Sequence, residues 1–383
     1  MIPRGKLYIS TRDIVSGMYF CLTDRFSSPN ANQDTDKLIC LSVRTGFDLA
    51  LEVLNFAPGS EILVTDINIP DMFGIIERHN LTSIPIPVNK HTLNISARTI
   101  EAAITPLTKA ILITHVFGGV SETDKIIAVA KKHNLIVFED CAQAYAGNLY
   151  DGNPESDVVM FSFGFIKTNT AIKGAVIKIR NPVLYAAVVL RNGTYKRQDT
   201  IGYLKKLFQV AFFKMLMSKL VYTAFYKIMI AKGKDFDKVL SGFIKSFPGE
   251  KIFEQIRYRP CRPNEQLLQK KLKNFNQNDI TKRVQLANDI LQNIPDSYKV
   301  GLKNRKHTHW VMPVETNDPN GLVEYLRKNG FDASQKASSM VQLKKTHPPC
   351  PEDLILEKLV YLPGYSQMSA KECEKLTALL IAY

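Results

Sequence analysis

The chain lacks the cysteine and hydropathy patterns of disulfide-rich, zinc-binding and membrane-spanning proteins. Its six cysteines lie far apart, with no CxxC pair and no cysteine–histidine pair at zinc-ligand spacing. No apolar run reaches the roughly 18 uncharged residues of a spanning helix. The N-terminus, MIPRGKLYISTRDIVSGMYF, lacks the basic start, apolar run and small-residue cleavage site of a secretory signal. These absences predict reduced thiols, no metal site and a cytoplasmic protein.

Acidic residues are scarce in one segment of the chain. The formal net charge is +14, and residues 194–262 hold 15 Lys and Arg against 5 Asp and Glu, which is +10 of that total. A basic protein raises the question of nucleic acid binding. The rest of the chain has nearly equal numbers of acidic and basic residues, and the segment has no recognisable nucleic-acid-binding motif. We therefore expect no nucleic acid partner.

Short apolar runs alternate with helical patterns from about residue 38 to 180. The candidate strands are LICLSV, EILVTDI, SIPIPV, AILITHVF, LIVFED, VVMFSF and GAVIKIR. Helical patterns lie between several of them, and two of these have Ser96 and Ser121 as expected N-caps. This alternation predicts an α/β fold with a mainly parallel seven-stranded sheet and helices on both faces.

The length of 383 residues predicts more than one compact core. We expect a large α/β domain with an N-terminal arm over 1–193, a basic apolar helical insertion over 194–262, and a smaller α+β domain over 263–383. In this last part, the patterns indicate one long helix or a helix pair over 265–294 and a strand over 307–315. Two further helices are expected, over 320–330 and 369–383.

The insertion contains LKKLFQVAFFKMLMSKLVYTAFYKIMI, which is apolar nearly all round and has lysines on several faces. One interpretation is a helix buried against a neighbour or a second subunit, with its lysine stems lying along apolar surface. The other is peripheral contact of residues 195–232 with an anionic membrane.

Three reactive side chains follow two neighbouring candidate strands. Asp140 ends the strand in VFEDCAQAYAG, and Ser162 and Lys167 follow in VVMFSFGFIKT. In parallel sheets, ligands bind at the carboxyl ends of the strands. A lysine amine can bind an aldehyde and move protons, a carboxylate can face a pyridine nitrogen, and a hydroxyl at a helix N-terminus can hold a phosphate. The order and spacing favour a site for pyridoxal 5'-phosphate (PLP).

The run EAAITPLTKAILITHVFGG, followed by HNLIVFEDCAQAYAG and FSFGFIKT, resembles the DegT/StrS family of PLP-dependent sugar aminotransferases, which have the aspartate-aminotransferase-like fold type I. The resemblance covers residues 38–193 well and 262–383 more loosely. It implies transfer of an amino group from an amino acid, glutamate or glutamine, to a keto sugar linked to a nucleotide. It also implies a homodimer in which the second subunit completes each site.

The same resemblance implies roles for individual residues. Lys167 would bind PLP covalently and act as catalytic acid and base, and Asp140 would face the pyridine nitrogen. Ala142 would pack on the ring and Gln143 would lie near its hydroxyl. For the phosphate, the resemblance implies contacts from Ser162 and from the turn SVRTG, through Arg44 and Thr45.

The sequence departs from the family pattern at the ring-stacking position. The stretch INIPDMF places Ile69 where many members carry an aromatic residue, and Phe73 is the substitute candidate. An asparagine that reaches the phosphate from the second subunit is not evident around 258–262. Arg262 resembles a family arginine whose role here is undetermined. Structural roles are expected for His115, His309 and Trp310.

Two other functions remain open. One is a PLP enzyme of the same fold with another reaction, such as dehydration, although the known sugar dehydratases resemble this family with the lysine replaced. The other is a non-catalytic, membrane-associated or regulatory protein that acts through the insertion. The altered stacking position favours the second alternative, whereas the intact lysine and aspartate oppose it.

Overall fold

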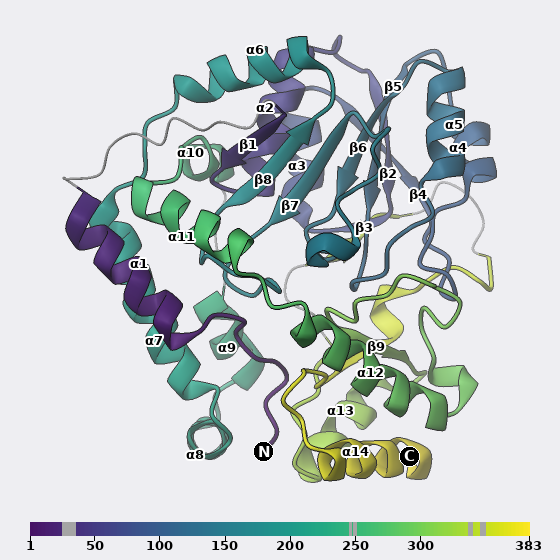
Figure 1. Cartoon of the computed structure of the whole chain (residues 1–383). Helices are drawn as coiled ribbons and strands as arrows, with labels where there is room; N and C mark the ends of the chain where they lie inside the picture. The colour runs from purple at the N-terminus through teal and green to yellow at the C-terminus, as the bar shows by residue number, and fades with distance from the viewer. Residues whose placement is uncertain (25–35, 245–246, 248–250, 336–339, 345–349) are drawn as a thin grey trace.

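The computed structural model describes residues 1–24, 36–244, 247, 251–335, 340–344 and 350–383. A large sheet with its helices forms the upper part of the molecule in Figure 1, and a smaller part with the C-terminal helices lies below it. All six cysteines are free, as expected.

The large sheet has seven strands in the order β1-β8-β7-β6-β5-β2-β4. Adjacent strands from β4 to β7 pair in parallel, and β8 is antiparallel to both β7 and β1. The mainly parallel sheet and its predicted strands are therefore confirmed. Its strands are β1 (Lys37–Cys40), β2 (Glu61–Thr65), β4 (Thr82–Ile86), β5 (Thr108–Thr114), β6 (Ile136–Asp140), β7 (Val158–Ser162) and β8 (Ala175–Ile179).

Helices cover both faces of this sheet. Successive strand residues point to opposite sides, so the apolar strands present apolar side chains on both faces. Leu112 of β5 packs with the cluster under α2 (Val43–Leu54), α3 (Pro70–Arg78) and α6 (Pro182–Gly193). Ile111 and Ile113 pack on the other side, under α4 (Ala97–Ala103) and α5 (Asp124–Lys132). Further along that second face, α1 (Thr11–Thr23), α7 (Thr200–Leu216) and α11 (Arg262–Lys273) cover β7 and β8.

One of the two expected N-caps is wrong. Ser96 caps α4 and accepts a hydrogen bond from the Thr99 N–H, as predicted. Ser121 lies before α5, whose N-cap is Thr123. Its N–H donates to His115 Nδ1 and its hydroxyl donates to the Leu93 carbonyl, so tertiary contacts use the groups that a cap would need.

The insertion contains several helices where the pattern of residues 204–230 appeared continuous. After α7 the chain turns at Met217 and Ser218 into α8 (Lys219–Ala231), followed by α9 (Phe236–Ile244) and α10 (Ile252–Ile256). The turn lets Tyr222 of α8 donate a hydrogen bond to Asp332 and pack on Phe236. Among the described residues, no helix is long and apolar enough to cross a bilayer.

The C-terminal part has its own apolar cluster. Its two-stranded antiparallel sheet joins β9 (Met312–Glu315) to β11 (Leu359–Leu362), and the expected helix pair is α11 and α12 (Asn278–Asn293). The expected strand over 307–315 is shorter, because it starts only at Met312. The remaining elements are α13 (Pro319–Lys328), α14 (Ala370–Ala382), β3 (Ile67–Asn68) paired with β10 (Val341–Gln342), and the 3-10 turns η2 (Gly147–Leu149), η3 (Asp296–Tyr298) and η4 (Leu356–Lys358).

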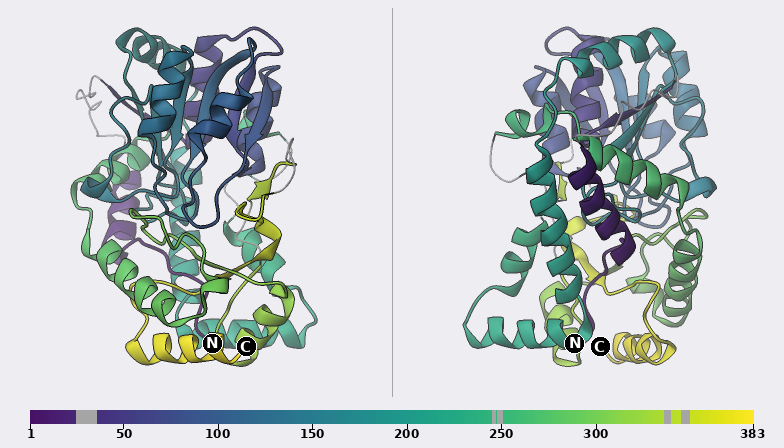
Figure 2. Two further views of the ribbon diagram at one scale, coloured as in Figure 1. Left: turned by 90° about the vertical axis from the view of Figure 1, so that its right-hand side faces the viewer. Right: turned by 60° about the vertical axis from the view of Figure 1, so that its left-hand side comes forward.

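The first residues of the chain lie against this C-terminal part. Both termini are at the bottom of the molecule in each view of Figure 2. Ile2 forms a β-bridge with Phe331, and its N–H donates to the Gly330 carbonyl. The start of the N-terminal arm thus packs against the C-terminal part. The predicted division of the sequence into three parts stays a prediction.

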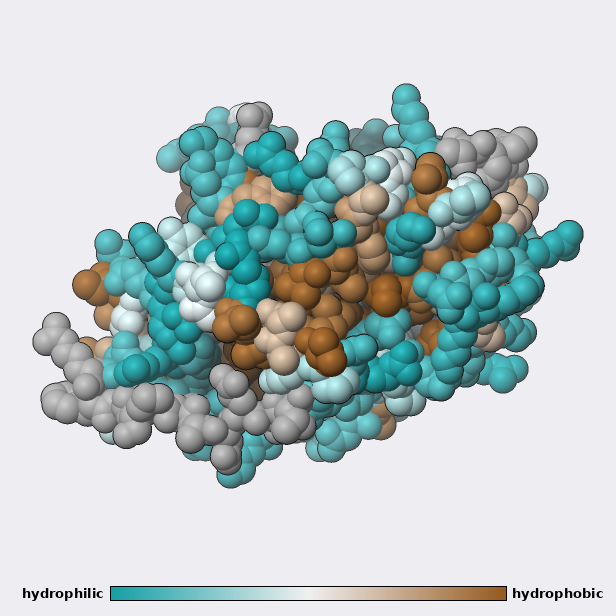
Figure 3. Space-filling model, turned by 90° about the horizontal axis from the view of Figure 1, so that it is seen from above, coloured by the Kyte–Doolittle hydropathy of each residue, from teal (hydrophilic) through white to brown (hydrophobic). Residues whose placement is uncertain are grey.

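The opposite end of the molecule carries apolar side chains on its surface. Seen from above, they gather near the centre of this face (Figure 3). Helix α6 crosses the top of the molecule in Figure 1, and its Val183 and Leu190 are each 77% exposed. This upper surface is therefore a candidate contact for a partner molecule.

Candidate active site

The predicted residues meet at the carboxyl ends of β6 and β7. Asp140 is the last residue of β6 and Ser162 the last of β7, and the two parallel strands pair directly. A cavity of about 430 Å³ opens at this edge. Of the predicted site residues, the cavity wall includes Arg44, Asp140, Ala142, Gln143, Ser162 and Lys167.

Asp140 is held by two donors. One carboxylate oxygen accepts from the Ala142 N–H at 3.0 Å, and the other accepts from Asn68 Nδ2 at 3.3 Å. The Asn68 amide also donates to Thr114 Oγ1 at 2.8 Å, which fixes its orientation. Asn68 was not predicted as a site residue, because only the pairing of the sheet brings the ends of β3, β5 and β6 together.

Lys167 lies in the loop after β7, five residues beyond Ser162. Its Nζ is 4.2 Å from the centroid of the Trp310 ring. Burial lowers the pKa of the Lys167 amine to about 8, the attraction of Asp140 opposes this shift, and the positive charge of Arg44 adds to it. A sizeable fraction of the amine is therefore neutral near physiological pH, as a nucleophile or proton acceptor requires.

The N-terminus of α2 borders the cavity and forms a candidate cradle for an anion. Ser42 is the N-cap of this helix, and Ser42, Val43 and Arg44 line the cavity next to Ser162. The first N–H groups of a helix lack partners within the helix and carry partial positive charge. The Arg44 guanidinium donates to Asp71 at 2.6 Å, so this arginine is already paired.

The structure does not bring Thr45 to the cavity wall. Its hydroxyl donates to the Ile256 carbonyl at 2.8 Å, and its N–H donates to Ser42 Oγ at 3.2 Å. The cap that starts the helix therefore uses the Thr45 N–H, and the Ile256 carbonyl takes the Thr45 hydroxyl. Gln143 does line the cavity, with its side-chain carbonyl accepting from the Phe117 N–H at 2.8 Å.

Two residues, Ile69 and Phe73, were candidates for the ring-stacking position. Ile69 lines the cavity, whereas Phe73 packs in the core beneath α3. Trp310, expected to be structural, also lines the cavity, and its indole N–H donates to the Ile166 carbonyl at 3.3 Å. The sequence gives no signal for this placement, because Trp310 comes from the chain segment before β9.

His115 is a packed strand-end residue, as expected. Its ring is fully buried, Nδ1 accepts from the Ser121 N–H, and Nε2 therefore donates to Glu139 at 2.8 Å. Arg262 is the first residue of α11 and is not part of the cavity wall. His309 is buried and stacks on His307, and it is not among the described residues of the cavity wall.

Comparison with known proteins identifies the family of the main segment. Residues 38–221 match the DegT/DnrJ/EryC1/StrS aminotransferase family. The match covers slightly less than half of the chain. A GDP-perosamine synthase from Caulobacter vibrioides is 32% identical over 159 residues, which are 41% of this chain and 43% of that protein. The match thus spans less than half the length of that relative.

Solved structures are similar over nearly the whole chain. The sugar aminotransferase CalS13 from Micromonospora echinospora has a TM-score of 0.68 and 16% identity, with 100% of both chains covered. NtdA from Bacillus subtilis, solved with bound cofactor PMP, has a TM-score of 0.66 and 16% identity, covering 98% of this chain and 82% of that one. The likeness at this identity establishes the fold, which is the expected fold type I.

Proposed function

We propose that this protein is a PLP-dependent aminotransferase that moves an amino group from glutamate or glutamine to a keto sugar carried on a nucleotide. The observation that carries this proposal is a lysine amine of lowered pKa beside a carboxylate, at the carboxyl ends of β6 and β7 in a segment of the DegT/DnrJ/EryC1/StrS family. The sugar-acting relatives support the substrate class.

The residues of the cavity fit PLP. Lys167 would bind the aldehyde, Asp140 would face the pyridine nitrogen, and Ser162 with the N-terminus of α2 would hold the phosphate. Ala142 and Ile69 would line the ring, and Gln143 would lie near its hydroxyl. When bound, PLP supplies an electron sink that makes the α-carbon of the amino donor acidic.

The protein contributes proton transfer and orientation. Lys167, with its pKa near 8, can accept a proton from the donor carbon and return one in the reverse direction. Asp140 stays oriented because Asn68 and the Ala142 N–H hold both of its oxygens. Trp310 lies against the Lys167 amine, with its ring centroid 4.2 Å from Nζ.

An absorbance titration with PLP tests the proposal. The wild type is expected to give a band at about 410–430 nm that borohydride removes, leaving a covalent adduct on Lys167. Adding glutamate should convert this band to one at shorter wavelength. Lys167→Ala should lose the band, whereas Lys173→Ala, another lysine of the same cavity wall, should keep it. If the wild type gives no such band, the proposed function is wrong.

The same experiment separates the alternatives. A lysine that holds PLP argues against a dehydratase of the kind that lacks it, and release of 2-oxoglutarate from glutamate identifies transamination. A non-catalytic protein would release no 2-oxoglutarate from glutamate, whether or not it binds PLP. The intact Lys167 and Asp140 support catalysis over both alternatives.

We also propose that the protein is a homodimer in which the second subunit completes each site. Light scattering after size-exclusion chromatography tests this, because a mass near that of one 43.2 kDa chain would contradict it. A cytoplasmic location, with peripheral membrane contact through residues 195–232, is the accompanying proposal.

The surface of α7 supports the membrane contact. Ile201, Phe208, Phe212 and Met215 follow one another at helical spacing and are each at least 50% exposed. Lys205 lies on the same exposed face. Flotation with anionic liposomes, compared with neutral liposomes and with Phe208→Gln plus Phe212→Gln, tests the proposal. Absence of the wild type from the anionic liposome fraction would refute it.

A further inference from the structure

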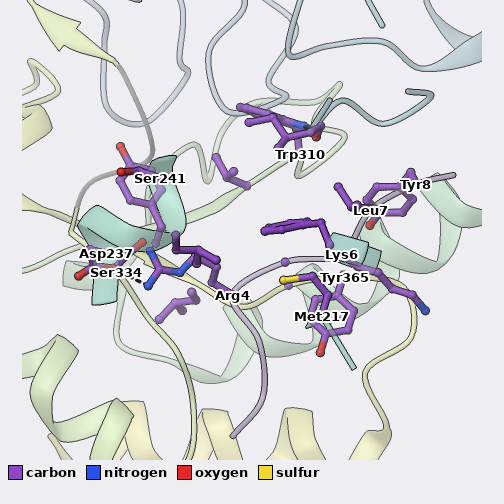
Figure 4. A pocket seen from close by; sticks show the side chains of 18 of the residues that line it. Arg4, Lys6, Leu7, Tyr8, Met217, Asp237, Ser241, Trp310, Ser334 and Tyr365 are labelled. Atoms are coloured by element: carbon purple, nitrogen blue, oxygen red, sulfur yellow. Dashed lines mark hydrogen bonds and ion pairs between the residues drawn. The ribbon is translucent and has the colours of Figure 1, made fainter. Parts of the chain in front are cut away.

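A second cavity, of about 480 Å³, lies beside the candidate cofactor cavity. The two cavities share four wall residues, which are Ile166, Lys238, Ser241 and Trp310. Figure 4 shows Trp310 on one side of the second cavity, facing residues of the N-terminal arm. The Lys167 amine lies against the same Trp310 ring. The Trp310 side chain therefore lies between the second cavity and the reactive nitrogen.

Distant segments give this cavity walls that are mainly aliphatic and aromatic. The N-terminal arm, the end of α7, α9 and the segment around β11 all contribute. Their apolar wall residues include Leu7, Phe213, Met217, Leu240, Leu362 and Tyr365. Apolar walls gain free energy from an apolar ligand, and a flexible methionine adapts to its shape.

Most charge at the cavity is already neutralised. Arg4 forms ion pairs with Asp332 and Asp237, and Asp237 also pairs with Arg327 (Figure 4 shows Arg4 beside Asp237). Lys6 and Lys238 are the wall cations for which no ion pair is found among the described residues. Asp235, also on the wall, has no ion pair among the described residues either and accepts from the Lys238 backbone N–H, so the two lysines leave one net positive charge, which favours a ligand with a single anionic group and an uncharged body.

A buried hydroxyl on the wall has no partner. Tyr361 is only 6% exposed, and its hydroxyl makes no hydrogen bond to the described residues. The hydroxyl of Tyr8, also on the wall, is likewise buried and unpaired within the described part of the chain. Both hydroxyl oxygens are almost inaccessible, so a ligand in the cavity would contact the rings of these tyrosines and not their hydroxyls.

We propose that the second cavity binds a hydrocarbon chain carried by the amino acceptor, next to the acceptor's anionic group. This inference rests on the aminotransferase function proposed above, with a phosphate that carries a hydrocarbon chain in place of the nucleotide of the acceptor. The hydrocarbon chain would lie among Leu7, Phe213, Met217 and Leu240. Lys6 and Lys238 would contact the anionic group. The acceptor's keto carbon would then reach Lys167 past Trp310.

Trp310 makes the test direct, because it is the only tryptophan of the chain. Its fluorescence is followed during titration with butyl, hexyl and octyl phosphate, below their micelle concentrations. Excess inorganic phosphate keeps the cradle at α2 occupied. We expect saturable binding that tightens about fourfold for each added methylene until the cavity is full.

Two matched variants test where the hydrocarbon chain binds. Met217→Lys places a charge on the cavity wall and should weaken octyl phosphate binding at least about tenfold. Met215→Lys adds the same charge on the outer face of α7, where Met215 is 57% exposed, and should leave binding unchanged. No saturable signal, no dependence on chain length, or a larger loss with Met215→Lys would overturn the proposal.

The PLP titration, run on the same samples, separates the two proposals. If PLP forms its Lys167 adduct but alkyl phosphates do not bind, the hydrocarbon site is wrong and the aminotransferase stands. If alkyl phosphates bind but PLP does not, the aminotransferase is wrong and the acceptor assignment falls with it. If Met217→Lys does not fold, the chain-length series of the wild type still decides the presence of the cavity site.

Discussion

Lys167 is the residue whose chemistry depends most on its surroundings. Its amine has an ordinary pKa of 10.5, and burial lowers this pKa to about 8. Only the neutral amine reacts with electrophiles, so we expect the acetylation rate of Lys167 to rise with pH and to level off above about pH 8. Pulse labelling with acetic anhydride and mass spectrometry measures this rate, with the exposed Lys205 as the reference. A rate that still climbs with pH near 10 would contradict the lowered pKa.

Asn68 illustrates a residue that acts through another. Its amide donates to Asp140 and to Thr114, so Asn68→Ala should free one oxygen of Asp140 without removing its charge. We expect PLP to bind about tenfold more weakly, since one hydrogen bond to a charged group contributes about 1.5 kcal/mol. The dissociation constant comes from Trp310 fluorescence. Asn89→Ala, on a surface loop, is the control, and equal PLP affinity in both variants would refute the positioning role.

At the scale of an element, the hydrogen bonds of one buried carboxylate hold the end of β6 in place. Glu139 accepts from His115 Nε2 at 2.8 Å, Ser156 Oγ at 2.8 Å and the Asn153 N–H at 3.0 Å, and also from Tyr150. Burial alone would raise its pKa, but the His115, Tyr150 and Asn153 hydrogen bonds lower the pKa of Glu139 to about 2. This cluster fixes the strand end that presents Asp140.

We therefore expect Glu139→Gln to lower the free energy of unfolding by about 2 kcal/mol at pH 7. The folded-state pKa lies below the ordinary value of 4.5, so the stabilisation is present above pH 4.5 and is lost as the pH falls toward 2. Urea unfolding at several pH values measures this. The exposed Glu155→Gln should change nothing measurable, and an equal acid sensitivity of Glu139→Gln and wild type would contradict the assignment.

The elements also show where sequence patterns are reliable. Every predicted strand of the large sheet is present, because apolar runs bounded by polar residues leave a buried strand few alternatives. Pro85 lies in β4, where an edge position tolerates the missing N–H. The break between α7 and α8 was not predicted, since no glycine or proline marks it and the contact of Tyr222 with Asp332 decides it.

At the scale of the whole molecule, one carboxylate joins three distant segments. Asp332 is fully buried and accepts from Arg4 Nε at 2.7 Å, from Arg327 Nε at 3.2 Å and from Tyr222. The N-terminal arm, the insertion and the C-terminal part therefore meet at this residue. Arg4 and the neighbouring arm residues also form one wall of the second cavity.

We expect Asp332→Asn to lower the free energy of unfolding by about 3 kcal/mol, because it leaves buried guanidinium groups without their full counter-charge. Asp296→Asn is the matched control, since Asp296 is 82% exposed and its pair with Lys299 should contribute no more than about 0.5 kcal/mol. Chemical denaturation followed by Trp310 fluorescence measures both. Similar losses for the two variants would show that Asp332 does not join the segments as described.

Local sequence patterns suffice to predict the α/β fold, the strands of the large sheet and the order of Asp140, Ser162 and Lys167 along it. These follow from local patterns, since apolar periodicity sets the strands and parallel pairing brings their ends together. Tertiary packing places Asn68 and Trp310 on the wall of the candidate cavity and leaves Thr45 off the described wall. It also decided the second cavity, because residues far apart in the sequence meet there through packing that no local pattern encodes.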